Sequence, residues 1–168
     1  DKELFNIADL YFANDNYFEL MEVPIIEGQG FDKEKSTNST ILVSQSFADK
    51  ISMLAGWTDG VIGKGITISG HNYEEISEGE YKHNANTIVG VYPNIRIGSI
   101  IDQDMRPSVI FYTDKPANNI IIKMHELGSD NIAKVYNVFK TALPNKEVVV
   151  EPYKNSMIKL YDGSRLFR

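Results

Sequence analysis

The sequence contains no cysteine among its 168 residues, so it has no disulfide, no thiol chemistry and no cysteine-ligated zinc or iron–sulfur site. Positive charge is also scarce: 17 Lys and Arg stand against 23 Asp and Glu, a formal charge of −6. Without a basic cluster, the chain is a poor ligand for duplex DNA or an anionic membrane. No apolar run approaches the roughly 20 residues of a membrane-spanning helix, so this segment is not expected to cross a bilayer.

The chain is nevertheless rich in core-forming residues. Hydrophobic residues make up 42% of it and include 8 Phe, 9 Tyr and 1 Trp, which excludes a disordered tail. Its length suits one domain or two small lobes. It begins at Asp1 without a signal-peptide pattern and ends inside a helical pattern. We therefore expect it to be either a processed product or a segment of a longer protein.

Strand-type patterns outnumber helical ones. Apolar or alternating segments predict strands at residues 3–14, 40–44, 66–69, 87–92, 108–113, 120–125 and 147–151. Helical spacing predicts a short helix at 16–21 capped by Asp15, and a second from Ser44 or Ser46 to about Leu54 with Gly56 ending it. It also predicts a helix from Ser129 or Asp130 to Leu143 and a last one from Tyr153. This order predicts an α+β fold with mixed sheets and packed helices, including a split βαβ unit at 120–151.

Two histidines near several glutamates raise the question of a metal site, but their spacing argues against one. His71 and His83 flank four glutamates in the polar segment 70–85. Their spacing matches no HExxH-type motif, and runs of charge usually face water. We interpret the segment as a solvated acidic loop between strands.

Two glycine-rich segments resemble phosphate loops only superficially. Gly28-Gln29-Gly30 and Gly63-Lys64-Gly65 lack the GxxxxGK[ST] and GxGxxG spacings, and the second precedes a strand instead of a helix. Both are predicted to be structural turns.

No catalytic set emerges from the remaining polar residues. The candidate serines have no GxSxG context, and paired carboxylates lie in a polar loop where a turn or cap is expected. These residues are Ser44, Ser46, Ser99, Ser108, Asp102 and Asp104. The chain is therefore predicted to be no enzyme and to hold no cofactor or metal.

Neighbouring aromatic residues raise the question of base stacking. Tyr11, Phe12, Tyr17 and Phe18 would form a stacking platform for nucleic acid only with Lys or Arg nearby, and none is present. We predict that these side chains pack in the core and that nucleic acid is not a partner.

A series of short motifs follows one another in a defined order. The motifs are Asn16–Met21, Ile25–Phe31, Ile41–Ala48, Ile62–Ile66, Thr87–Val91, Pro107–Val109 and Lys159–Tyr161. This series resembles the MacB-like periplasmic core domain, the extracytoplasmic module of type VII (FtsX/MacB/LolC-type) ABC transporter permeases. The chain departs from the family pattern at Gln29, where the family usually has Arg, and in the long segment 70–85.

The resemblance implies a fold of two lobes within a single periplasmic core domain spanning 1–168. A porter-like lobe with the split βαβ unit would comprise approximately residues 1–30 and 115–168, and a smaller mixed α/β lobe approximately 31–114. The motif residues would be structural: Tyr17, Phe18, Gly28, Phe31, Gly63, Lys64, Val89, Gly90, Val91 and Pro107.

The resemblance also implies a function. The domain would lie at the periplasmic face of the bacterial inner membrane and couple ATP-driven conformational change to export, efflux or mechanotransmission. Its partners would be a cytoplasmic ABC ATPase, reached through transmembrane helices absent from this segment, a periplasmic adaptor or lipoprotein, and a second copy of the full permease.

Two alternatives remain open. The acidic, aromatic-rich composition also suits a free-standing secreted module that binds a ligand or peptide. The second alternative to the permease domain is a hydrolase whose active site uses the loop between His71 and His83. Apolar helices of about 20 residues on both sides of the segment would favour the permease.

Overall fold

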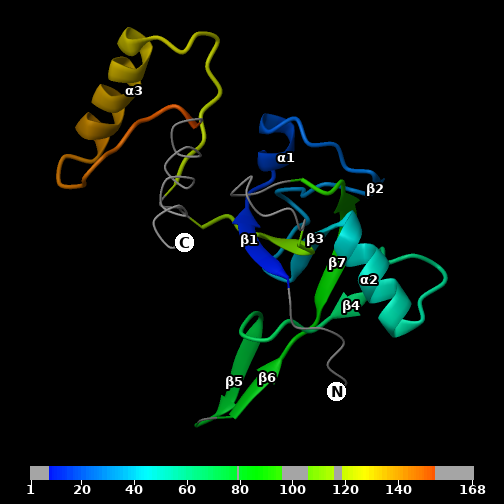
Figure 1. Ribbon diagram of the computed structural model, residues 1–168. Helices are drawn as coiled ribbons and strands as arrows, with labels where there is room; N and C mark the ends of the chain where they lie inside the picture. Colours follow the sequence, from blue (N-terminus) through cyan, green and yellow to red (C-terminus); the bar gives the residue numbers. More distant parts are fainter. Residues whose placement is uncertain (1–7, 79, 96–105, 116–118, 154–168) are drawn as a thin grey trace, which may run out of the picture. The chain divides into compact units, whose positions relative to one another are not determined.

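The computed structural model in Figure 1 describes residues 8–78, 80–95, 106–115 and 119–153. The chain forms two compact units. Unit 1 contains the described residues up to 95 together with 106–115, and unit 2 contains the described residues 119–153.

Unit 1 is built on a six-stranded mixed sheet. The strands run in the order β1 (Asp9–Ala13), β8 (Ser108–Tyr112), β3 (Thr40–Ser44), β7 (Asn86–Tyr92) and β2 (Glu27–Gly28), and β4 (Gly65–Ile66) also pairs with β7. The pairs β1–β8 and β3–β7 are parallel, whereas β3–β8, β2–β7 and β4–β7 are antiparallel. The predicted α+β fold with a mixed sheet is confirmed.

The two faces of this sheet are covered by different helices. On one face, Ile41 and Val43 of β3 join Phe47 and Ile51 of α2 (Gln45–Ala55) in the hydrophobic core. On the other, Phe18 of α1 (Tyr17–Leu20) packs on Tyr92, and Phe31 packs on Tyr112. Because both faces are covered, β3 and β8 are buried at every position and show no apolar–polar alternation.

Helix α2 begins and ends as its sequence predicts. The Ser44 hydroxyl accepts a hydrogen bond from the Phe47 N–H, and Gly56 ends the helix in the left-handed conformation, at φ 69°. The other predicted caps are wrong. Asn16, not Asp15, precedes α1, and Gly128 precedes α3 (Ser129–Ala142). Asp130 lies inside the first turn of α3, where the helix dipole favours a carboxylate.

The polar segment 70–85 forms a two-stranded antiparallel ribbon instead of a loop. Its strands are β5 (Tyr73–Ser77) and β6 (Glu80–His83), and every residue in both strands is exposed. Asn72 holds the base of the ribbon, because its Nδ2 donates to Ser39 Oγ and to the Ala85 carbonyl, each at 3.1 Å. The strand predicted at 66–69 is reduced to β4.

Unit 2 contains the predicted amphipathic helix α3 without its predicted strands. Residues 120–125 and 147–151 belong to no strand, so the described residues form no split βαβ unit and those two strand predictions are wrong. Their apolar sequences favour extended backbone, but a strand also requires a neighbour for its N–H and C=O groups. Ile120 is 63% exposed and Val149 71%. The helix predicted beyond Tyr153 lies outside the described residues.

The strands of unit 1 come from both of the lobes expected from the sequence. β1 and β2 lie within residues 1–30, yet both belong to the sheet that contains β3, β7 and β8. The division of the core domain into two lobes stays a prediction. Within the described ranges, no helix has the length and apolarity needed to cross a bilayer.

The buried Ser44 hydroxyl is predicted to stabilise unit 1. It caps α2 and also accepts the Ser108 N–H at 2.9 Å, which ties β3 to β8. The substitution Ser44→Ala leaves a buried N–H without its acceptor, so we expect the free energy of unfolding to fall by about 1–3 kcal/mol. Urea denaturation followed by the fluorescence of Trp57 measures this change.

Ser52→Ala, within the same helix, is the matched control. Alanine has a higher helix propensity than serine, so this variant should differ from wild type by less than about 0.5 kcal/mol. Equal losses in the two variants would contradict a specific role for the Ser44 hydroxyl.

Candidate functional site

Gly28 and Gly90 face each other where β2 crosses close to β7. A Cβ on Gly28 would overlap the carbonyl oxygen of Val89, and one on Gly90 would overlap the carbonyl oxygen of Gln29. Gly28 also has φ 74°, in the region that favours glycine. The Gln29 N–H donates to the Val89 carbonyl at 2.9 Å. Both glycines therefore allow two backbones to meet, which is a structural role.

The segment Gly63-Lys64-Gly65 leads the chain from α2 back to the sheet. Gly63 has φ 79°, and its N–H donates to the Ile88 carbonyl at 2.8 Å. Lys64 Nζ lies 2.8 Å from Asp59 Oδ2 and 5.8 Å from the ring centroid of Trp57. Hydrogen bonding from Lys64 lowers the pKa of the exposed Asp59 carboxyl. Lys64 thus contributes to the local loop structure.

An aromatic cluster under α1 contains three further motif residues. Phe18 packs on Tyr92 with ring centroids 5.3 Å apart, and it also contacts the rings of Tyr17 and Phe31. The Tyr92 hydroxyl is within 2.8 Å of Ser108 Oγ, and burial raises the pKa of Tyr92 well above its usual value. This cluster fills the face of the sheet opposite α2.

The last three motif residues lie in or beside strands. Val91 is buried in the core with α2, Val89 is half-buried in β7, and the Pro107 carbonyl accepts the Asp9 N–H at 2.9 Å. The ten motif residues are thus spread along both faces and one edge of the sheet and do not converge on a shared site.

Those residues considered for catalysis that the structure describes do not form a catalytic set. Ser44 and Ser108 are buried partners in the hydrogen bonds described above, and the Ser46 N–H donates to Asn94 Oδ1. Ser99, Asp102 and Asp104 lie outside the described residues. His71 stacks on Phe111, whereas His83 contacts Tyr73. Among residues whose positions are described, no three His, Asp or Glu side chains group as a metal site.

An exposed aromatic groove in unit 1 is the feature that the sequence analysis missed. Phe12 was predicted to pack in the core, but its side chain is 58% exposed, so that prediction is wrong. Phe12, His71 and Phe111 line a cavity of about 360 Å³, together with Tyr73 at the base of the ribbon and with Lys115. Tyr73, Tyr81 and His83 are separated by even numbers of residues, which is the spacing of side chains on one face of a strand. This spacing predicts the aromatic face only once residues 70–85 are known to form a ribbon.

The fold is that of a known periplasmic domain. The chain aligns with the periplasmic region of MacB from Actinobacillus actinomycetemcomitans with a TM-score of 0.55 and 12% sequence identity, over 94% of this chain and 67% of that chain. The predicted MacB-like fold is confirmed at this level. A weaker likeness, with a TM-score of 0.47 and 18% identity, is found to a domain of a permease-type protein from Porphyromonas gingivalis, over 89% of this chain and 70% of that one.

No protein-family model matches the chain. No curated protein sequence matches it either.

Because β2 and β7 approach closely at Gly28 and Gly90, position 90 is predicted to tolerate no side chain. In Gly90→Ala, the new Cβ forces β2 away from β7, and we expect a loss of about 1–3 kcal/mol in the free energy of unfolding. Gly30→Ala is the control, because its nearest neighbour would be Ile25 Cγ1 at an ordinary 3.7 Å. Urea denaturation of both variants measures the difference, and equal stabilities would show that the close approach is unimportant.

Loss of the Lys64 ammonium should change the titration of Asp59. In Lys64→Met, we expect the pKa of Asp59 to rise toward its ordinary value, because the hydrogen bond and the positive charge are removed. In wild type, the stabilisation from this lowered pKa is present above the unfolded-state pKa and lost as the pH falls through the folded-state value.

Carboxyl resonances in an NMR pH titration measure this shift. Asp32 is the internal control, since its pKa is lowered by the Glu34 N–H and by Lys35, which the substitution leaves intact. An unchanged Asp59 titration in the variant would rule out the ion pair in solution.

Proposed function

We propose that this chain is the extracytoplasmic domain of an ABC transporter permease, situated at the periplasmic face of the bacterial inner membrane. The observation that carries the proposal is the alignment of 94% of the chain with the periplasmic region of MacB. The order of the sequence motifs from Asn16 to Tyr161 supports it independently, because that order is a property of the sequence and does not depend on the fold.

In this proposal the domain transmits movement. An ATPase in the cytoplasm, in the same protein or a separate subunit, hydrolyses ATP, and membrane helices outside this chain pass the resulting displacement to the domain. Unit 1 suits this task because its central strands are buried on both faces. The Ser44 hydroxyl also connects β3 to β8, and the close approach of Gly28 and Gly90 connects β2 to β7. A densely packed sheet moves as one body when an edge is displaced.

The partners in this proposal are the ATPase, a second copy of the permease, and an adaptor or lipoprotein outside the membrane. A free-standing peptide-binding module is the second candidate. The exposed groove beside Phe12 favours it, because a groove of this size accepts a side chain or a short ligand. The location of the domain relative to membrane helices distinguishes the two.

Cysteine labelling in cells tests the location. The chain contains no cysteine, so Met53→Cys introduces one thiol at a side chain that is 75% exposed on α2. In cells that express the full-length protein, we expect a membrane-impermeant maleimide to modify this thiol once the outer membrane is permeabilised. Val43→Cys, at a fully buried position, is the control and should react only after denaturation.

Two outcomes decide the proposal. Modification of Met53→Cys only after the inner membrane is lysed would place the domain on the other side and end the proposal. Release of the labelled protein into the soluble periplasmic fraction would favour the free-standing module. If the protein stays with the membrane, trapping the ATPase with vanadate should change the labelling rate several-fold, as coupling requires.

A further inference from the structure

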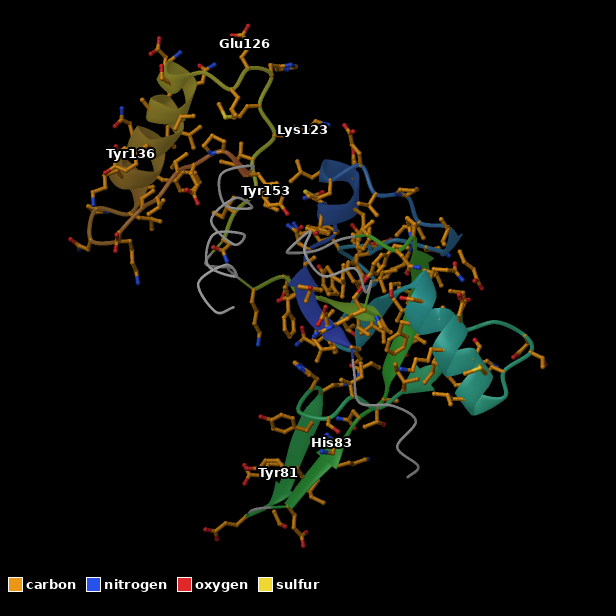
Figure 2. All side chains as sticks on the ribbon, in the orientation of Figure 1. Tyr81, His83, Lys123, Glu126, Tyr136 and Tyr153 are labelled. Atoms are coloured by element: carbon orange, nitrogen blue, oxygen red, sulfur yellow. The ribbon has the colours of Figure 1, made fainter. Side chains whose placement is uncertain are left out.

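We propose that an aromatic strip on unit 1 binds an extended, basic segment of a partner protein. The strip comprises Phe12, Phe111, His71, Tyr73, Tyr81 and His83. Figure 2 shows Tyr81 and His83 on the protruding ribbon. This inference identifies the surface through which the proposed domain binds a partner. It rests on the proposed function only for the cellular compartment in which the partner is found.

The strip is continuous from the sheet to the ribbon. At the sheet end, His71 stacks on Phe111 at 4.8 Å, and Phe12 stacks on Phe111 at 5.3 Å. On the ribbon, Tyr73 meets the Tyr81 ring edge to face at 5.3 Å. Tyr73 also lines the cavity of about 360 Å³ with the three rings of the sheet end. The rings therefore form one path across two elements.

The strip is accessible because α2 covers only part of its sheet face. The hydrophobic core formed with α2 contains residues of β3, β7 and β8, but its members include none of the β1 residues 9–13. Phe12 is 58% exposed, Tyr73 54% and Tyr81 52%, whereas Phe111 is 2% exposed and belongs to the core. Phe111 is thus the buried floor of the strip, on which Phe12 and His71 stack. Phe12 and Tyr73 line the groove, and Tyr81 continues the exposed rings along the ribbon. Aromatic rings exposed together in this way are characteristic of interaction sites.

The backbone of β1 favours an extended ligand. β1 is at the end of the strand order in the sheet that the structure describes. The Asp9 N–H donates to Pro107 and the Ala13 carbonyl accepts from Thr113, so in this parallel pair the backbone groups of Leu10 and Phe12 point to the outer edge. An extended segment can pair with that edge while its alternate side chains contact the strip.

The charge of the ribbon favours a basic segment. Residues 73–83 carry Glu74, Glu75, Glu78 and Glu80 against Lys82, a formal balance of 1 − 4 = −3 without His83. Lys115, which lines the cavity at the sheet end, brings the balance to −3 + 1 = −2. Glu75 pairs with Tyr81 and so lies on the face of the tyrosines, whereas Glu74, Glu80 and Lys82 lie on the opposite face of the ribbon. The Tyr rings attract Arg and Lys by cation–π contact, and Glu75 attracts them by charge. The same carboxylates repel phosphates, which disfavours single-stranded nucleic acid as the occupant.

The ribbon is held in place before any partner arrives. Asn72 has φ 51°, and its Nδ2 donates to both Ser39 and Ala85 at the base of the ribbon. The Asn84 N–H donates to the Asn72 carbonyl at 2.8 Å. Because the base is fixed, binding along the strip costs less ordering than binding to a flexible loop.

The test uses the purified chain and two synthetic peptides. One is a peptide of about ten residues that alternates Arg and Val, which favours an extended conformation, and the other replaces every Arg with Glu. We expect the basic peptide to bind and to shift the NMR resonances of Phe12, His71, Tyr73 and Tyr81. The acidic peptide should not bind.

Matched variants locate the binding. Tyr73→Ser with Tyr81→Ser should weaken the dissociation constant about tenfold, through loss of two cation–π contacts. Tyr136→Ser is the control, because Tyr136 is an exposed tyrosine on α3 in unit 2 (Figure 2). Glu75→Gln, on the face of the two tyrosines, should weaken binding and its salt dependence. Glu74→Gln, on the opposite face of the ribbon, and Glu126→Gln, in unit 2, should change both less.

Several results would overturn the inference. They are equal affinity for the two peptides, no binding of either peptide, resonance shifts confined to unit 2, or an equal effect of Tyr136→Ser and of Tyr73→Ser combined with Tyr81→Ser. An unchanged thermal transition of the ribbon variants excludes unfolding as the cause of lost binding. The peptide test needs no membrane, so its failure leaves the labelling result standing, and the reverse also holds.

Discussion

The burial of β3 is the constraint on which the rest of unit 1 depends. This strand pairs with β7 on one side and β8 on the other, and all five of its residues are buried. Ile41 and Val43 face α2, while the alternate residues face the aromatic cluster under α1. At its end, Ser44 both starts α2 and fixes β8. Sheet pairing, helix position and side-chain packing thus meet on one strand.

This arrangement determines which parts of unit 1 remain outside the core. α2 follows β3 directly, so it lies over the central strands of the sheet. On the same face of the sheet it leaves β1 uncovered at Phe12, which is exposed. The excursion between β4 and β7 leaves the sheet as the ribbon β5–β6, whose base is fixed by Asn72. The exposed aromatic strip is a consequence of these two connections.

A domain of this kind is suited to work by position and contact. Its polar interior is occupied by structural hydrogen bonds such as Tyr92–Ser108, and its glycine motifs hold strands together. The proposed transmission of movement needs a rigid body and an outward surface. The packed sheet supplies the first, and the ribbon with the groove beside it supplies the second.

Local sequence determined the elements that local interactions define. The strands at 40–44, 87–92 and 108–113 and helix α2, from Ser44 to Gly56, follow from apolar runs and caps that act within a few residues. Tertiary structure decided the rest. The apolar segments 120–125 and 147–151 have no strand partner among the described residues, Phe12 is on the uncovered part of a face, and residues 70–85 pair with each other. Strand pairing and burial depend on neighbours distant in the chain, which a local pattern does not identify.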